Sequence, residues 1–399
     1  MQLSSGLISE ITEARATVRI KVNGVEATGT GSIYLSDLWS WPDPAISHAS
    51  RDQQMRALCL EIAKNLPSWC QPAAHPLELG LRLHDLVCHG GDTPPLLARA
   101  LCMSPFDAAI HDATGRALQC SAFSLYEENL PLPAVDRYFA GSNAFEAIRR
   151  CLRPRKEALD AWWIVGAKDI LPSAIEKAFK KGGYSCFKIK LLAKSVEEDL
   201  ARTISIHDAA KAVGIANPKL SLDSNEGNKD TAEVLEFLKR LQAERPDVFN
   251  ALQYLEQPTG RDITVHRHDW NEASRLKPIL LDEGLTDLSL LPLAREQGWS
   301  GLALKTCKGH SFTLVAAAWA HENGIPVAMQ DLTNPGYAAI HSFLIAAHLD
   351  VINGIELNSP QFTPSANEAW LPRLADLFAI RDGKHRLPIA SLVGLGSEL

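Results

Sequence analysis

Seven short apolar segments in the second half of the chain each end in a polar residue that can hold a metal ion or carry a proton. In chain order these end residues are Lys190, Asp223, Glu256, Asp282, Lys305, Gln330 and Glu356. They are separated by 33, 33, 26, 23, 25 and 26 residues, an interval that one strand, one helix and two loops would fill. The repeat predicts parallel βα units, which close into a barrel and bring their strand ends together around one pocket.

Amphipathic stretches between the apolar segments predict the barrel helices. We expect them at residues 172–181, 196–213, 230–243, 286–297, 310–323 and 335–349, with the first strand near 162–165. Pro131 and Pro133 mark a boundary before the barrel. The expected fold class is therefore α/β, a (β/α)8-type modified TIM barrel over residues 131–366. An α+β capping domain over residues 1–130 precedes it, and a C-terminal segment, 367–399, packs back toward that domain.

The first 130 residues alternate between strand and helix patterns. Period-two alternation around an Asn23–Gly24 turn predicts a hairpin over residues 16–34. Helices are expected at 53–66 and 94–101.

A further helix is predicted to start at Ser104. This serine would be its N-cap, and Pro105 would occupy the first helical position. The connection over residues 35–44 contains Trp39 and Trp41, which belong either to the core or to a loop that closes over a bound substrate.

Composition narrows the class of protein. The 399 residues are 46% hydrophobic and 22% charged, with a net charge of -7, so nucleic acid and anionic membrane surfaces are not expected partners. No apolar run approaches the roughly 18 residues that span a bilayer, and the N-terminus lacks the pattern of a secretory signal. The eight cysteines contain no C-x-x-C pair. Together these features predict a cytoplasmic protein with free thiols.

Three carboxylates close successive strands: Asp223, Glu256 and Asp282. Any one of them alone is equally well explained as a helix N-cap. Three in one pocket would repel one another unless a cation neutralised them, and ligation by oxygen alone favours Mg2+, with Mn2+ as the alternative. Glu283 could substitute for Asp282, although its side chain is expected to point away from the pocket.

Lysines flank these acids. Lys188 and Lys190 lie two residues apart on one strand, so both side chains face the barrel interior, where mutual repulsion would lower their pKa and produce a general base. The alternative is that both extend from the strand end to solvent. Lys305 ends a strand four positions further round the ring. A substrate in the pocket would then have one lysine on each face.

This motif set resembles the muconate-lactonising subgroup of the enolase superfamily, which is related to mandelate racemase. The resemblance rests on the K-x-K pair, D-x-N, E-Q-P, D-E and the later lysine, together with 110–118, 28–31 and 394–396 outside the barrel. It implies that Asp223, Glu256 and Asp282 bind Mg2+. It also implies that Lys190 and Lys305 are the acid/base pair, with Lys188 beside them.

The resemblance implies abstraction of the proton α to the carboxylate of a small-molecule substrate, with a metal-stabilised enediolate intermediate. Racemisation, epimerisation or cycloisomerisation would follow. A dehydratase (lyase) of the same superfamily and a non-catalytic metal-binding member are the alternatives. A metal-dependent hydrolase is disfavoured because no histidine ends these strands. Assembly as a homo-oligomer is left open.

Several positions depart from the family pattern. The eighth strand ends in Glu356-Leu357-Asn358 rather than Asp-x-Asp, and no histidine ends the seventh. Asp331 occupies that region, either as a substrate contact or as a loop residue. We expect substrate contacts from Asn225, Asp331, Glu356, Trp39 and Trp41, but the sequence does not name the substrate.

Overall fold

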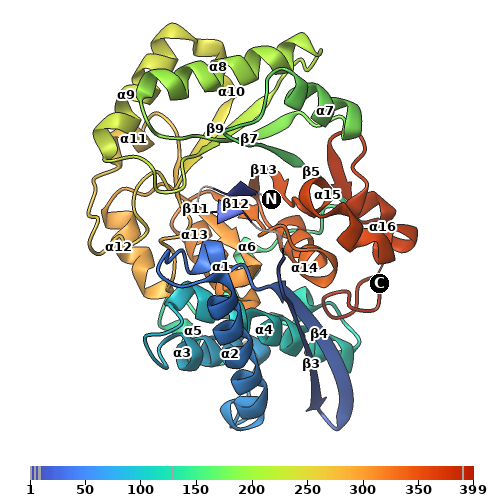
Figure 1. The fold of residues 1–399 in the computed structure, drawn as a ribbon. Helices are drawn as coiled ribbons and strands as arrows, with labels where there is room; N and C mark the ends of the chain where they lie inside the picture. The colour runs from blue at the N-terminus through green and yellow to red at the C-terminus, as the bar shows by residue number, and fades with distance from the viewer. Residues whose placement is uncertain (1, 4–5, 8–9, 128–129, 389–390) are drawn as a thin grey trace.

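Eight parallel strands form the centre of the molecule. The computed structural model describes residues 2–3, 6–7, 10–127, 130–388 and 391–399. The strands lie in chain order in one sheet (Figure 1): β6 (Trp162–Val165), β7 (Cys186–Lys190), β8 (Lys219–Asp223), β9 (Leu252–Glu256), β10 (Ile279–Leu281), β11 (Gly301–Lys305), β12 (Val327–Gln330) and β13 (Val351–Glu356). A bridge between Ala161 and Ile355 joins the two edges. The predicted (β/α)8-type barrel is confirmed.

Helices cover the outside of the barrel. They are α7 (Ser173–Gly182), α8 (Val196–Ala212), α9 (Thr231–Glu244), α10 (Pro246–Ala251), α11 (Asn271–Ser274), α12 (Leu291–Glu296), α13 (His310–Glu322) and α14 (Gly336–Ala347). The prediction of one helix over 286–297 was wrong, because a 3-10 turn, Leu288–Leu290, precedes a shorter α12. Pro292 lacks the N–H that a continuous helix would need at that point.

Side chains alternate between the lumen and the outer face of each strand. On β7, Phe187 and Ile189 pack outward in the main hydrophobic core, whereas Cys186 faces inward with Trp162 and Tyr254. The rings of Trp162 and Tyr254 lie 6.0 Å apart and help to fill the barrel below the strand ends. The polar end residues lie above these packed rings, at the strand ends.

The N-terminal part packs a hairpin against helices. The hairpin, β3 (Glu13–Val22) and β4 (Val25–Tyr34), turns at Asn23–Gly24 as predicted. It packs against α4 (Leu96–Leu118) and contacts α2 (His48–Trp69). Helix α3 (Pro76–Cys88), which was not predicted, packs on α4. Strand β4 crosses α4 so closely that a Cβ on Gly29 would collide with the backbone of Ala113. The glycines of this strand therefore permit the contact.

The prediction that a helix begins at Ser104 was wrong. Helix α4 is continuous through Pro105. A proline cannot donate to the carbonyl four residues earlier, here that of Leu101. The hydroxyl of Ser104 donates to this carbonyl instead, at 2.9 Å. The serine thus replaces the missing bond within the helix and does not act as a cap.

The C-terminal segment contacts both parts of the chain. It contains α15 (Ser359–Phe362), α16 (Leu371–Phe378) and β14 (Lys384–Arg386), which pairs with β5 (Ala158–Asp160) next to the barrel. Further on, the buried carboxylate of Asp112 on α4 accepts hydrogen bonds from the N–H of Leu395, at 2.7 Å, and of Thr30, at 2.9 Å. One side chain therefore joins hairpin, helix and C-terminus. The domain boundaries at 130 and 366 stay predictions.

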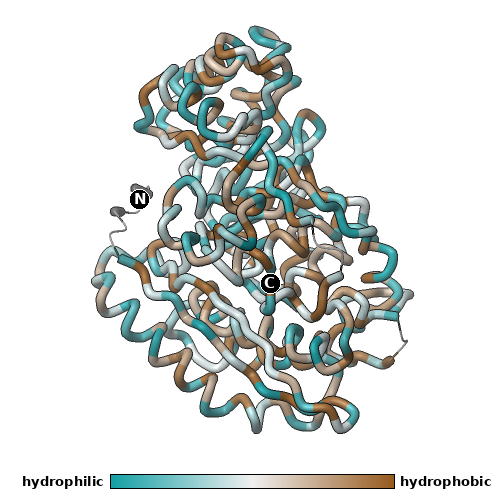
Figure 2. Tube along the Cα trace, turned by 90° about the vertical axis from the view of Figure 1, so that its right-hand side faces the viewer, coloured by the Kyte–Doolittle hydropathy of each residue, from teal (hydrophilic) through white to brown (hydrophobic). Residues whose placement is uncertain are grey.

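Hydrophobic and hydrophilic residues are interspersed along the whole trace (Figure 2). Within the described residues, no helix is both long and apolar enough to span a membrane. All eight cysteines lie in the described part and are free thiols.

The contacts of Asp112 generate a stability prediction. Asp112→Ala leaves two N–H groups without their acceptor, at ~1–3 kcal/mol each, so the free energy of unfolding should fall by about 3 kcal/mol. Denaturant titration measures this loss. Glu296→Ala, at an exposed site on α12, is the control and should stay within about 0.5 kcal/mol. Equal stability of the two variants would contradict the anchoring role.

Candidate active site

The predicted end residues gather at one mouth of the barrel. Six of the seven are the last residue of their strand, and Asp282 directly follows β10. All of them except Gln330 line a cavity of about 320 Å³. Among the described residues, seven carboxylates (Asp223, Glu226, Glu256, Asp282, Glu283, Asp331 and Glu356) and four cations (Lys188, Lys190, Arg261 and Lys305) line it. Negative charge is therefore in excess.

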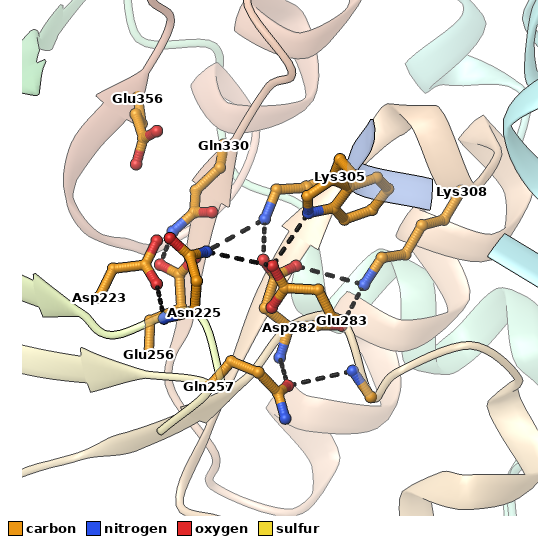
Figure 3. A network of polar contacts seen from close by, with 12 residues as sticks. Asp223, Asn225, Glu256, Gln257, Asp282, Glu283, Lys305, Lys308, Gln330 and Glu356 are labelled. Atoms are coloured by element: carbon orange, nitrogen blue, oxygen red, sulfur yellow. Dashed lines mark hydrogen bonds and ion pairs between the residues drawn. The ribbon is translucent and has the colours of Figure 1, made fainter. Parts of the chain in front are cut away.

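The three predicted metal ligands are linked through shared lysine partners. Lys188 Nζ lies 3.1 Å from Asp223 Oδ2 and 2.9 Å from Glu256 Oε1. Lys305 Nζ pairs with Asp282 and lies 3.8 Å from the same Glu256 oxygen. Glu256 is thus placed between the other two carboxylates, and Figure 3 shows this cluster from close by.

Burial and charge shift the carboxyl pKa values in opposite directions. Burial raises the pKa of Glu256 to about 8, because Lys188 only partly offsets the loss of solvation and Asp223 adds repulsion. Burial also acts on Asp223, but Lys190 and Lys188 outweigh it and lower its pKa to about 2. For Asp282, Lys305 and Lys308 outweigh burial and lower the pKa. Cations therefore outweigh burial at Asp223 and Asp282 but not at Glu256.

This donor set fits a hard divalent cation. The candidate ligand atoms are all carboxylate oxygens, which suit Mg2+ or Mn2+, and the excess negative charge of the lining would be reduced by such an ion. Asp223, Glu256 and Asp282 are the residues that would hold it.

The expected depression of the pKa is not found at Lys188. Burial disfavours the ammonium of Lys188, but Glu256, Glu356 and Asp223 outweigh burial and raise its pKa well above the usual value. Asp282 and Glu256 likewise overcome burial and raise the pKa of Lys305. The sequence argument considered repulsion between lysines, whereas the nearest charges in the fold are carboxylates.

The two predicted acid/base lysines stand on opposite sides of the barrel mouth. Lys190 ends β7 and Lys305 ends β11, four strands apart in the closed sheet. The side chain of Lys190 is 24% exposed, compared with 3% for Lys188. Lys190 is therefore the more accessible of the K-x-K pair.

Glu283 lines the cavity, contrary to the expectation that it points away. Its Oε1 accepts a hydrogen bond from Trp39 Nε1 at 3.0 Å and lies 3.4 Å from Asn225 Nδ2. The chain turns directly after β10, so the alternation of strand side chains no longer applies there. Burial, reinforced by Asp282, raises the pKa of Glu283 to about 7.

The other predicted substrate contacts have different surroundings. Asn225 lines the cavity, and its Oδ1 accepts from Lys190 at 3.0 Å. Glu356 pairs with Lys188 at 2.9 Å. Asp331 also lines the cavity, but its carboxylate accepts backbone N–H groups of Thr333, at 2.9 Å, and Asn334, at 3.1 Å. Asp331 therefore holds its own loop.

The two tryptophans lie in different surroundings. Trp39, in helix α1 (Asp37–Ser40), lines the cavity, and Lys305 Nζ lies 5.5 Å from the centre of its ring. Trp41 is buried in the N-terminal hydrophobic core with Met55 and Phe106 and does not line the cavity. The expectation of a substrate contact at Trp41 is corrected accordingly.

Elsewhere, a group of metal-ligand type lies outside the cavity. His207, Asp208 and Asp247 bring ligand atoms within 4.8 Å of one another, the one such group found in the described part of the chain. Arg245 pairs with both aspartates, at 2.7 and 2.8 Å. This group is a surface ion-pair network.

Sequence reasoning missed two buried residues behind the cavity. Gln257 Oε1 accepts the N–H of Asp282 at 2.9 Å, and Lys308 Nζ donates to the carbonyl of Asp282 at 2.6 Å. Their signals were the Q of E-Q-P and the second lysine of Lys305-Thr306-Cys307-Lys308.

The described arrangement agrees with solved structures. A muconate lactonizing enzyme from Klebsiella pneumoniae is 20% identical, with 97% of this chain and 93% of that chain covered and a TM-score of 0.62. A muconate cycloisomerase from Pseudomonas fluorescens is 20% identical, with 96% and 92% covered and a TM-score of 0.60. An N-succinyl Arg/Lys racemase from Bacillus cereus is 18% identical, with 96% and 87% covered and a TM-score of 0.61. At such identity the likeness establishes the fold.

No curated protein sequence matches this one. The model of the enolase C-terminal domain-like family, however, matches residues 171–399, more than half of the chain and the part that supplies seven of the eight barrel strands. Together with the barrel and the structures it resembles, this match establishes that the chain belongs to the enolase superfamily, in its mandelate racemase and muconate-lactonising branch.

Proposed function

We propose that this protein is an enzyme that removes the proton α to a carboxylate of a small molecule and returns a proton to the same carbon or lets the intermediate cyclise. Racemisation or epimerisation and cycloisomerisation are the favoured outcomes. The observation that carries the proposal is the placement of Lys190 and Lys305 on opposite sides of a cavity that is also lined by three carboxylates from successive strand ends.

The lysines have distinct proposed roles. Lys188 is surrounded by Asp223, Glu256 and Glu356, so it is fixed in place and supplies positive charge. Lys190 has fewer partners and more exposure, which suits a group that must reach a substrate and exchange its proton with solvent. Lys305 faces the cavity beneath Trp39 and would serve the other face of the substrate.

The proton transfers follow from this placement. Neutral Lys190 Nζ would take the α-proton while the C–H electron pair stays with the substrate, and the ammonium of Lys305 would donate a proton from the other face. When bound by Asp223, Glu256 and Asp282, Mg2+ would supply positive charge that stabilises the negative charge developing on the substrate carboxylate. Trp39 covers Lys305 and would limit the access of water.

A lyase of the same superfamily is the second candidate. It uses the same proton abstraction, followed by loss of a leaving group in place of reprotonation. A non-catalytic metal-binding member is disfavoured by the presence of both lysines beside the three carboxylates.

The metal assignment predicts selective loss of Mg2+ binding. Asp223→Asn, Glu256→Gln and Asp282→Asn should each weaken Mg2+ affinity by more than about tenfold and abolish activity with the fold intact, since each removes a charged ligand. Calorimetric titration measures the affinity. Glu226→Gln is the control, because this acid lines the same cavity but pairs with Arg261. Wild-type affinity in any of the three variants would remove that residue from the metal site.

The acid/base assignment predicts that each lysine exchanges the α-proton on its own face of the substrate. In D2O with Mg2+ and a library of carboxylates, Lys190→Ala should still exchange the α-proton of one stereoisomer and Lys305→Ala that of the other. Both should lose racemisation by roughly 10² to 10⁴ or more. Lys194→Ala, at an exposed lysine beyond the strand end, is the control. Racemisation by either active-site variant at the wild-type rate would refute the two-base assignment. Dependence on one lysine alone would favour elimination or cycloisomerisation.

The raised pKa of Glu256 predicts proton release on metal binding. Below its pKa of about 8 the carboxyl holds a proton that must leave before the oxygen can bind a metal ion. Mg2+ affinity should therefore fall by about tenfold per pH unit from about pH 8 to about pH 6, with one proton released per ion. Calorimetry in two buffers of different ionisation enthalpy measures the release. An affinity that does not change over this range would contradict the prediction.

A further inference from the structure

The three proposed metal ligands differ in how the backbone holds them. Asp223 and Glu256 are the last residues of β8 and β9, and the parallel ladder pairs them with each other. Asp282 lies beyond β10, whose paired residues end at Leu281. The third ligand therefore sits where the sheet no longer fixes the chain.

Two buried side chains hold Asp282 in place of the ladder. On one side, Gln257 Oε1 accepts the N–H of Asp282 at 2.9 Å and that of Gly284 at 3.0 Å. On the other, Lys308 Nζ donates to the carbonyl of Asp282 at 2.6 Å and lies 3.5 Å from its Oδ1. Figure 3 shows both contacts. The peptide groups on both sides of Asp282 are thus held by side chains.

Both residues are energetically unfavourable at their positions, which indicates that their side chains have a specific role. Gln257 has a φ of 35°, in the left-handed region that disfavours a side chain, yet it is a fully buried glutamine. Lys308 is 2% exposed, and a buried ammonium is unfavourable without a compensating role. Its bond to a backbone carbonyl would persist when the carboxylate of Asp282 is bound to a metal ion.

We propose that Gln257 and Lys308 are positioning residues that clamp the peptide backbone of Asp282 so that its carboxylate meets those of Asp223 and Glu256. The proposal rests on the metal role of Asp282 proposed above. Neither residue lines the cavity. The hydrogen bonds of these two side chains hold the backbone at Asp282, where strand pairing has ended.

The direction in which Lys308→Met changes Mg2+ affinity distinguishes a positioning role from a purely electrostatic one. Lys308→Met removes a cation near a metal ligand, so loss of repulsion alone would tighten Mg2+ binding. A clamp predicts the opposite, an affinity at least about tenfold weaker, as for other residues that orient metal ligands. Lys308→Arg, which keeps a cationic donor, should restore part of the loss. Calorimetry of the full-length protein with Mg2+ gives these affinities, and unchanged or tighter binding by Lys308→Met would overturn the proposal.

A double-mutant cycle and a matched control exclude a general loss of structure. In an Asp282→Asn background, Lys308→Met should change Mg2+ affinity by less than about twofold, because the ligand it orients is already lost. The control is Arg99→Met. Arg99 is another buried cation that donates to backbone carbonyls, those of Pro94, Val87 and Thr93, but it lies away from the cavity. Its loss should lower stability and leave Mg2+ affinity unchanged.

A measurement on the wild-type protein tests the clamp without any variant. With and without Mg2+, hydrogen exchange at the amides of Asp282 and Gly284 should be slow, because Gln257 holds both before a metal ion arrives. Rapid exchange in the metal-free protein would overturn the clamp. If Asp282→Asn keeps wild-type Mg2+ affinity, the proposed metal role fails, and the exchange result still decides whether the clamp exists.

Discussion

The balance between buried carboxylates and ammonium groups at the strand ends is the constraint on which the site depends. Two like charges about 4 Å apart repel by about 4 kcal/mol at an effective dielectric constant of ~20, so acids gathered in one pocket require cations. Lys188 and Lys305 supply them by contacting carboxylates from neighbouring strands. Burial raises the pKa of Glu256, and because four cations face seven carboxylates in the described lining, the lysines offset this rise only in part. The same excess of carboxylates over cations leaves negative charge that a divalent cation would compensate.

Much of this arrangement could be predicted from the sequence, because parallel strands make chain position equivalent to position around a ring. An apolar run followed by a polar residue gives the strand end, and the closed barrel places all strand ends together. What could not be predicted lies just beyond the strands. Glu283 turns into the cavity, and Lys308 reaches back beneath Asp282, since the path of a loop sets these directions. The same limit explains the error at Pro105, where the hydroxyl of Ser104 preserves a helix that the sequence pattern interrupts.

The connection after the first hairpin illustrates a related limit. Trp39 and Trp41 are two residues apart and chemically identical, so the sequence left core and cavity roles open for both. One short helical turn, α1, directs Trp39 toward Glu283 and Lys305, and Trp41 into the N-terminal core. Arg261, from the loop after β9, donates to the carbonyl of Trp39 at 3.1 Å and pairs with Glu226 at 2.6 Å. The helical turn that carries Trp39 is thus anchored to the N-terminal core through Trp41 and to the barrel through Arg261.

Differences in enclosure explain why neighbouring lysines can have separate roles. Lys188 and Lys190 project from the same face of β7, yet Lys188 is enclosed by three carboxylates and Lys190 remains partly open. An ammonium held by three anions resists losing its proton, because deprotonation would leave those anions uncompensated. A lysine nearer the cavity mouth is less constrained and can contact a substrate. The position of each lysine along β7, rather than its residue type, would therefore determine whether it can take part in the proposed proton transfer.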